Sequence, residues 1–390
     1  MDTRPTREIS FGSPIIGAPE LRAVEEVLLS GILVHGPRAK AFETNFAAFT
    51  GAQHAISVAS CTAGMHLAYY TIGLKPGDEV IVPAMTHTAT AHAVAYTGAT
   101  PIFVDAENET GNIDLDAIEA AITERTRAIA IVHFLGYPVR MDRIRAIAEK
   151  RALFVMEDAA LAVGTYYKGQ HAGTMGDAGC FSFYPVKHMT TAEGGMILAR
   201  DGGFAEKLQR LKAFGLDRTL DQRKQPGVYD VVDLGFNFRM NEIEAALGIE
   251  QVKRMPDVLA RRHENYDALA AELADMAEVT LFPERAGKKD PDCVNSCYCL
   301  SAVLDPKLTG KRPDIVNNLK ARGVGSSVYY PRPVPLMTYY REKYGAKEDQ
   351  FPVAQWISDG SISLPVGAHL TPDDMRYVAG AFKQAVSESV

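Results

Sequence analysis

The sequence predicts an α/β protein in which a large, mostly parallel sheet domain is followed by a smaller C-terminal α/β domain. Over the first two-thirds of the 390 residues, short apolar runs alternate with amphipathic stretches, a pattern typical of βαβ units. Some runs are apolar at every position, as in Ile129–Val132, which fits strands that are buried on both faces. After residue 280 the composition changes, with Pro, Lys and Asp clustered over Pro283–Asp292. We expect the large domain to span residues 1–250 and the smaller one 251–390.

The apolar runs define the expected strands in chain order. In the large domain they are His54–Val58, Glu79–Pro83, Thr100–Val104, Ala128–Phe134, Ala152–Met156, Gly179–Phe183 and Gly195–Leu198. In the smaller domain we expect two strands, Val294–Leu304 and Ser326–Tyr330. The strands of the large domain are therefore short and separated by segments long enough for crossover helices.

The amphipathic stretches define the expected helices. The first five in chain order are Pro19–Leu29, Thr62–Ile72, Leu115–Thr123, Met141–Arg151 and a long stretch over 241–276 that is interrupted near Pro256. Pro19 at its first turn and Gly31 at its end mark the first of these helices. Two further helices, Pro313–Arg322 and Pro372–Glu388, are expected in the smaller domain.

Composition and charge exclude several classes of protein. The 41 basic and 48 acidic residues give a net charge of −7, so no bulk positive field attracts nucleic acid or anionic lipid. No apolar run approaches the length of a membrane helix, and the polar N-terminus lacks the apolar stretch of a signal peptide. Five cysteines are an odd and sparse set, which favours a reducing cytoplasm.

Three of the cysteines, Cys293, Cys297 and Cys299, cluster in the sequence. A closed zinc site needs about four ligands, and no second Cys or His pair follows at ligand spacing. The surrounding run Val294–Leu304 has the residue types of a strand. We therefore expect a strand here and no metal site.

A first candidate binding segment, Ser60–Gly64, follows the strand His54–Val58 and opens a helix with small residues. The N–H groups at a helix N-terminus suit a phosphate. A simple N-cap by Ser60 or Thr62 is the alternative interpretation. The segment matches neither the dinucleotide-binding fingerprint nor the P-loop, so a NAD-dependent enzyme has little support.

Two further candidates are an acid at a strand end and a lysine between two strands. Asp158 follows the apolar run Leu153–Met156, where a buried carboxylate needs a partner. Lys187 stands among aromatic and apolar residues; desolvation lowers a lysine pKa and makes the amine a nucleophile that can form a Schiff base. Acids at strand ends and solvated lysines are also common, but a phosphate cup, a carboxylate and a nucleophilic lysine together match the needs of pyridoxal 5'-phosphate (PLP).

The order of these motifs resembles the DegT/StrS family of sugar aminotransferases, which belong to the fold type I, aspartate-aminotransferase-like PLP enzymes. The resemblance covers nearly the whole chain. Its motifs are Gly36-Pro37 before Phe42-Glu43, then Ser60–Ala68, Lys75–Pro83, Ala95–Asp105, Glu157–Ala160, Ser182–Lys187, Glu193–Gly195, Gly235–Met240, Ala245–Gly248 and Ser363–Pro365.

The resemblance implies roles for individual residues. Thr62, Ala63 and Ser182 would bind the cofactor phosphate, and Asp158 would face the pyridine nitrogen. Lys187 would be the catalytic lysine that binds the cofactor aldehyde. Asn237 resembles the asparagine that reaches the phosphate of the neighbouring subunit, which implies a homodimer with shared active sites.

This chain departs from the family pattern at three positions. His87 stands where an aromatic residue usually stacks on the pyridine ring, and Leu161 where Gln or His often contacts the ring hydroxyl. Met337 replaces a frequent histidine near the substrate. The substrate-side residues are expected to include four others: His188, Tyr184, Arg239 and Tyr329.

By this resemblance the protein would transfer an amino group from L-glutamate to a nucleotide-linked keto-deoxysugar, giving an aminosugar for a surface polysaccharide, such as lipopolysaccharide, or an antibiotic. A dehydratase subgroup carries histidine in place of the lysine; here Lys187 remains and His188 is its neighbour, which favours transamination. A PLP-dependent nucleotide-sugar dehydratase and a non-catalytic PLP-binding regulator are the alternatives.

Overall fold

The structure is a computed structural model that describes residues 7–217, 225, 228–282 and 290–389. Its main feature is a seven-stranded sheet with the order β1-β9-β8-β5-β4-β2-β3. Only β9 runs against its neighbours, because it pairs antiparallel with both β1 and β8 while the other pairs are parallel. The strands are β1 (His54–Val58), β2 (Glu79–Pro83), β3 (Thr100–Val104), β4 (Thr126–Val132), β5 (Phe154–Asp158), β8 (Ala178–Ser182) and β9 (Gly195–Ala199). All seven predicted strands of the large domain are confirmed, with ends shifted by at most two residues.

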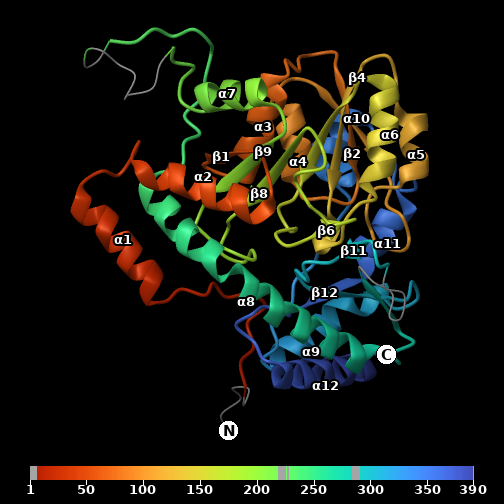
Figure 1. The fold of residues 1–390 in the computed structure, drawn as a ribbon. Helices are drawn as coiled ribbons and strands as arrows, with labels where there is room; N and C mark the ends of the chain where they lie inside the picture. Colours follow the sequence, from red (N-terminus) through yellow and green to blue (C-terminus); the bar gives the residue numbers. More distant parts are fainter. Residues whose placement is uncertain (1–6, 218–224, 226–227, 283–289, 390) are drawn as a thin grey trace.

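Helices cover both faces of this sheet (Figure 1). On one face lie α3 (Cys61–Thr71), α4 (Thr88–Ala95) and α7 (Gly202–Leu211), and on the other α5 (Leu115–Ala121) and α6 (Met141–Arg151). Since side chains alternate along a strand, Val80 and Val82 enter the first core and Ile81 enters the second. Burial on both faces explains why these strands are apolar at every position and confirms the predicted fold class.

The long helix α8 (Glu242–Leu273) runs unbroken through Pro256, so the predicted interruption was wrong. Asn241 caps its N-terminus and forms a capping box with Glu244, and packing along its whole length outweighs the hydrogen bond that the proline removes. Its first half packs on α2 (Pro37–Thr50). A Cβ on Gly248 would lie 2.6 Å from the ring of Phe42, so only glycine allows this approach. A domain boundary at residue 250 would fall inside one continuous helix.

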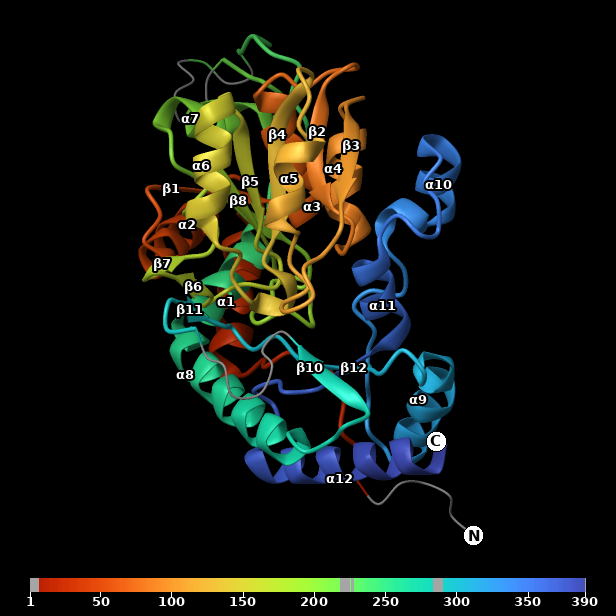
Figure 2. The ribbon, with the colours of Figure 1, turned by 90° about the vertical axis from the view of Figure 1, so that its right-hand side faces the viewer.

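The second half of α8 packs on a smaller antiparallel sheet, which lies below the large sheet in Figure 2. This sheet consists of β10 (Val279–Phe282), β12 (Leu300–Leu304) and β13 (Ser361–Leu364). Helices α9 (Arg312–Ala321) and α12 (Pro372–Ser389) complete the hydrophobic core of this smaller sheet. The remaining elements are α1 (Ala18–Ser30), β6 (Tyr166–Tyr167), β7 (Gln170–His171), β11 (Cys293–Val294), α10 (Thr338–Tyr344), α11 (Pro352–Gly360) and three short 3-10 turns.

The two predicted strands of the C-terminal part are confirmed only in part. The run Val294–Leu304 is divided, because β11 pairs with β6 whereas β12 pairs with β10 and β13. Between them Cys297 has a φ of 54°, which ends the extended conformation. The run Ser326–Tyr330 makes only one bridge, from Ser327 to Ser363.

Among the described residues, no helix is long and apolar enough to cross a membrane. Within the same part of the chain, no three His, Cys, Asp or Glu side chains gather closely enough to hold a metal ion.

The end of strand β5 is anchored by the fully buried side chain of Glu157. Its carboxylate accepts hydrogen bonds from the backbone N–H groups of Gly173 and Met175, each at 2.8 Å, and from Nε2 of His133 at 2.9 Å. Nδ1 of His133 accepts the N–H of Val139 at 3.1 Å, so the ring proton must be on Nε2. Glu157 therefore ties two loops to the end of the strand whose last residue is Asp158.

We expect Glu157→Ala to lower the free energy of unfolding by about 3–5 kcal/mol, because it leaves several buried donors without an acceptor. Unfolding in urea measures the change. The matched control is Glu149→Ala on the exposed face of α6, where Glu149 pairs with Arg145 at 3.4 Å; this change should stay within about 0.5 kcal/mol. Equal stability of the two variants would contradict the anchoring role.

Candidate active site

Strand pairing brings the predicted binding segments to one edge of the large sheet. Val58 and Ser182 both pair with Gly195, from opposite sides, and Asp158 pairs with Cys180. Val58, Ser182 and Asp158 are the last residues of three strands that run in the same direction. Such an edge is where ligands bind in parallel sheets.

The turn after β1 forms a small cup at the N-terminus of α3. Ser60 caps the helix, and its Oγ accepts the N–H of Ala63 at 3.1 Å. Ser60 therefore acts as an N-cap, which was the alternative interpretation of this segment. Cys61 and Thr62 lie in the first turn, where N–H groups have no intrahelical partner. A Cβ on Gly195 would lie 2.5 Å from the backbone nitrogen of Cys61. Glycine at this position therefore allows the helix end to approach the sheet, and the chemistry of the cup suits an anion.

Asp158 is buried at the edge next to this cup, with 4% of its surface exposed. Neutral groups satisfy its carboxylate: the hydroxyl of Thr90 donates to Oδ2 at 2.7 Å, and the N–H of Ala160 donates to Oδ1 at 3.1 Å. Each oxygen keeps the capacity to accept a further hydrogen bond. The site thus offers a fixed carboxylate to a positively charged ligand group.

Lys187 is half-buried on the turn between β8 and β9, and its backbone N–H donates to the carbonyl of Tyr184 at 2.9 Å. Its Nζ lies 5.3 Å from the ring centroid of Tyr298, over the face of the ring. Desolvation lowers the pKa of Lys187, and the Asp158 carboxylate opposes this shift. A lowered pKa leaves more of the amine unprotonated near neutral pH, which is the form that acts as a nucleophile or base.

Tyr298 comes from the C-terminal part of the chain, between β11 and β12. Its hydroxyl lies 2.8 Å from that of Tyr329, and its carbonyl accepts a hydrogen bond from Arg262 of α8 at 3.0 Å. Sequence reasoning missed Tyr298, Thr90 and the buried Tyr330. The run around Tyr298 looked like an ordinary strand, and nothing in its spacing indicates proximity to Lys187.

The three departures from the family pattern have clear environments. His87 caps α4, with its Nδ1 accepting the N–H of Ala89 at 3.1 Å, and its ring centroid lies 5.8 Å from that of Tyr330. Desolvation lowers the pKa of His87, which favours the neutral imidazole. Leu161 is buried in an apolar cluster with Tyr330, and Met337 is half-buried before α10.

The predicted substrate-side residues are placed differently from one another. His188 is buried, and its Nε2 donates to the carbonyl of Ser296 at 3.0 Å, which leaves only Nδ1 for another partner. Burial and the charge of Arg262 hold the pKa of His188 well below its usual range. Tyr184 is 49% exposed beside the lysine turn, and Tyr329 is half-buried against Tyr298.

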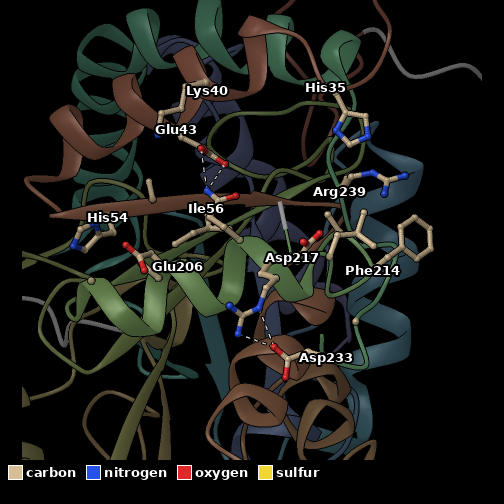
Figure 3. Close-up of a pocket in the computed structure, with 18 of the residues that line it drawn as sticks. His35, Lys40, Glu43, His54, Ile56, Glu206, Phe214, Asp217, Asp233 and Arg239 are labelled. Atoms are coloured by element: carbon tan, nitrogen blue, oxygen red, sulfur yellow. Dashed lines mark hydrogen bonds and ion pairs between the residues drawn. The ribbon is translucent and has the colours of Figure 1, made fainter. Parts of the chain in front are cut away.

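Asn237 and Arg239 lie apart from this cluster. Asn237 is exposed on a segment that bridges to Ala213. Arg239 lies 4.9 Å from the ring of Phe214 and lines a cavity of about 1440 Å³ between α2, α7 and residues of the ranges 213–217 and 229–235 (Figure 3). None of the cup residues, Asp158 or Lys187 lines that cavity.

The segment that carries Asn237 is connected to the cup by a buried ion pair and by backbone hydrogen bonds. Glu43 and Lys212 are 3.0 Å apart, and Glu43 also accepts the N–H of Ser57 at 2.9 Å. The carbonyl of Lys212 accepts the N–H of Phe238, and the carbonyl of Phe238 accepts the N–H of Ala59, which precedes the cup. The segment carrying Asn237 is therefore fixed to the same strand end as the cup.

We expect Tyr298→Leu to lower the pKa of Lys187 further, because the ring face that attracts the ammonium is lost. An interaction of about 0.5–2 kcal/mol corresponds to a shift of up to about 1.5 pKa units. Labelling of Lys187 in cofactor-free protein, followed by mass spectrometry at a series of pH values, measures the shift. Tyr298→Phe also loses the hydroxyl but keeps the ring, so its Lys187 should titrate as in the wild type. Equal midpoints of Lys187 labelling in the wild type, Tyr298→Phe and Tyr298→Leu would contradict the role of the ring.

Comparisons with known proteins agree with this architecture. The spore coat polysaccharide biosynthesis protein SpsC of Bacillus subtilis strain 168 is 37% identical over 386 residues, covering 97% of each chain. Spr1654 of Streptococcus pneumoniae, assigned as a sugar aminotransferase and solved in PLP and PMP forms, superposes in its PMP form with a TM-score of 0.92 at 29% identity, covering 98% of this chain and 100% of that one. DesI, solved in the presence of its TDP-sugar product, superposes with a TM-score of 0.84 at 32% identity, covering 98% of this chain and 93% of that one.

The match to a family model spans residues 14–383, nearly the whole chain. Together with the superpositions it confirms the fold type I architecture and PLP as the cofactor. The chain belongs to the DegT/DnrJ/EryC1/StrS aminotransferase family.

Proposed function

We propose that the protein is a nucleotide-sugar aminotransferase that transfers the amino group of L-glutamate to the keto carbon of a nucleotide-linked keto-deoxysugar. The observation that carries the proposal is the half-buried Lys187, whose pKa is lowered by desolvation, beside the fixed carboxylate of Asp158. The TDP-sugar product of DesI supports a nucleotide-linked substrate. The name of SpsC supports an aminosugar that enters a polysaccharide.

The residues at the sheet edge fit PLP group by group. The first turn of α3, with Thr62 and Ala63, and the hydroxyl of Ser182 would bind the phosphate. Asp158 would accept a hydrogen bond from the protonated pyridine nitrogen. The neutral ring of His87 would lie against the cofactor ring. The fit rests on the glycine that lets α3 approach the sheet and on the neutral donors that hold Asp158.

When bound, PLP supplies an electron sink for the carbon that loses a proton. Lys187 would hold the cofactor aldehyde before the donor arrives. Once displaced, its Nζ would take a proton from the α-carbon of the donor and return one to the cofactor, and it would repeat this in reverse with the sugar. The lowered pKa of Lys187 favours the unprotonated form of the released amine.

An acidic chain must bind anionic substrates through local groups. The net charge of −7 gives no general attraction for a nucleotide sugar or for glutamate. Arg239, Tyr184, Tyr329 and His188 remain the proposed substrate-side residues. No disulfide joins the five cysteines, all of which lie in the described part of the chain, which supports action in the reducing cytoplasm.

We further propose a homodimer whose two active sites are shared. Helix α1 buries Ala23 and Val27 against α8, whereas Leu21 and Leu29 on its other side are 66% and 81% exposed. Figure 1 shows α1 at the outer edge of the molecule. The segment before Asn237 is also apolar and exposed, with Leu234 at 75%. Exposed apolar patches of this kind mark interfaces, and a second copy would cover them while Asn237 reaches its phosphate.

We expect the purified protein, loaded with PLP, to change its absorption spectrum when L-glutamate is added, because the amino group moves to the cofactor. 2-Oxoglutarate should form in an amount equal to the enzyme sites when no sugar is present. Rapid-mixing absorbance and quantification of the oxo acid measure this half-reaction.

Lys187→Ala should abolish that half-reaction and Lys207→Ala, on helix α7, should retain it. An unchanged spectrum with glutamate, or full activity of Lys187→Ala, would contradict the proposed transfer. A deoxygenated sugar product without nitrogen from glutamate would instead indicate the dehydratase.

We expect a mixture of Lys187→Ala and Asn237→Ala protomers to regain activity at a limiting PLP concentration at which neither variant works alone. One site of the mixed dimer then has both native residues, so random reassembly should restore about a quarter of the wild-type activity. Steady-state assays after mixing and reassociation measure the recovery.

Leu29→Glu, added to both the Lys187→Ala and the Asn237→Ala protomer, should prevent the recovery of activity. Analytical ultracentrifugation should then show monomers. Val294→Glu also adds a charge at an exposed apolar position, but on β11, and should leave the recovery intact. Absence of recovery in stable mixed dimers would show that the sites are not shared.

A further inference from the structure

Two threonine hydroxyls form a chain that ends on Asp158. Oγ1 of Thr86 lies 2.7 Å from Oγ1 of Thr90, and Oγ1 of Thr90 lies 2.7 Å from Oδ2 of Asp158. Both threonines are buried, with 1% and 0% of their surfaces exposed. No solvent therefore competes for these hydroxyl groups.

The direction of the chain follows from the number of protons. A hydroxyl carries one proton, and an ionised carboxylate can only accept. The proton of Thr90 is used on Asp158, so the proton of Thr86 must be the one shared between the two threonines. Both donors thus point toward the carboxylate, and each hydrogen bond polarises and strengthens the next.

The position of Thr90 connects this chain to the cofactor side of the site. Thr90 lies in the first turn of α4, three residues after His87, which caps the same helix. The second oxygen of Asp158 is held by the N–H of Ala160. The carboxylate is consequently fixed from two sides by neutral donors, and its negative charge is not cancelled by a protein cation within hydrogen-bond distance among the described residues.

We propose that Thr90 is a positioning residue for PLP, whose hydroxyl holds the carboxylate of Asp158 in place for the pyridine nitrogen, and that Thr86 orients Thr90 for this task. The proposal rests on the proposed role of Asp158. A hydrogen bond to the charged form of a carboxylate stabilises that form. Without it, the carboxylate loses the donor that fixes Oδ2, and its hydrogen bond to the protonated pyridine nitrogen is weakened.

The test compares Thr90→Val with Thr90→Ser in the PLP-loaded protein. Valine keeps the branched shape and removes the hydroxyl, whereas serine keeps the hydroxyl and removes a methyl group. We expect Thr90→Val to weaken PLP binding by at least about ten-fold, the loss of one hydrogen bond to a charged group. NMR of PLP isotopically labelled at its pyridine nitrogen should show the resonance displaced toward that of an unprotonated pyridine.

Thr90→Ser should retain the wild-type resonance and PLP affinity, and Thr86→Val should displace the resonance in the same direction as Thr90→Val but by less. Thr90→Val with a wild-type resonance, or Thr90→Ser that behaves like Thr90→Val, would overturn the proposal. Asp158→Asn distinguishes a failure of the role of Thr90 from a failure of the role of Asp158. If it alone displaces the resonance, the role of Thr90 is wrong; if it leaves the resonance unchanged, the proposed role of Asp158 fails and the role of Thr90 with it.

Discussion

The end of strand β5 carries two adjacent carboxylates that point to opposite faces of the large sheet, and much of the site depends on this pair. Glu157 is occupied by buried donors from two loops and by His133. Asp158 is held by two neutral donors, Thr90 and Ala160, and stays open to a ligand. The two side chains lie on opposite faces because successive side chains along a strand alternate between the faces of a sheet. One carboxylate therefore fixes the position of the other without neutralising it.

The lysine depends on a part of the chain that is remote in sequence. Tyr298 places the face of its ring under Nζ of Lys187, and Arg262 of α8 holds the carbonyl of Tyr298. The proton affinity of Lys187 thus results from opposing effects: desolvation favours the amine, whereas Asp158 and the tyrosine ring favour the ammonium. Asp158 of the large sheet and Tyr298 of the C-terminal part of the chain both contribute to this balance, so the site cannot be complete in the large sheet alone.

Much of the fold could be predicted from local pattern. Each strand of the large sheet is a short apolar run, and strand ends such as Ser182 and Asp158 place the candidate residues at one edge. Tertiary effects could not be predicted this way. The continuity of α8 through Pro256 depends on packing along both halves, and the break near Cys297 depends on a positive φ. Local pattern does not indicate Thr90 or Tyr298 either, because they contact Asp158 and Lys187, which are distant from them in sequence.

Helix α8 also acts as a mechanical link between the two sheets. Met255 and Val258 belong to the core shared with α2, while Tyr266 and Leu269 belong to the core of the smaller sheet. Pro256 has no N–H to give the carbonyl of Val252, so the helix is most easily bent there. A rotation of the small sheet would pivot at this point and move Arg262, and with it the tyrosine beneath the lysine. A change in the angle between the two sheets would therefore change the basicity of Lys187 through the ring of Tyr298.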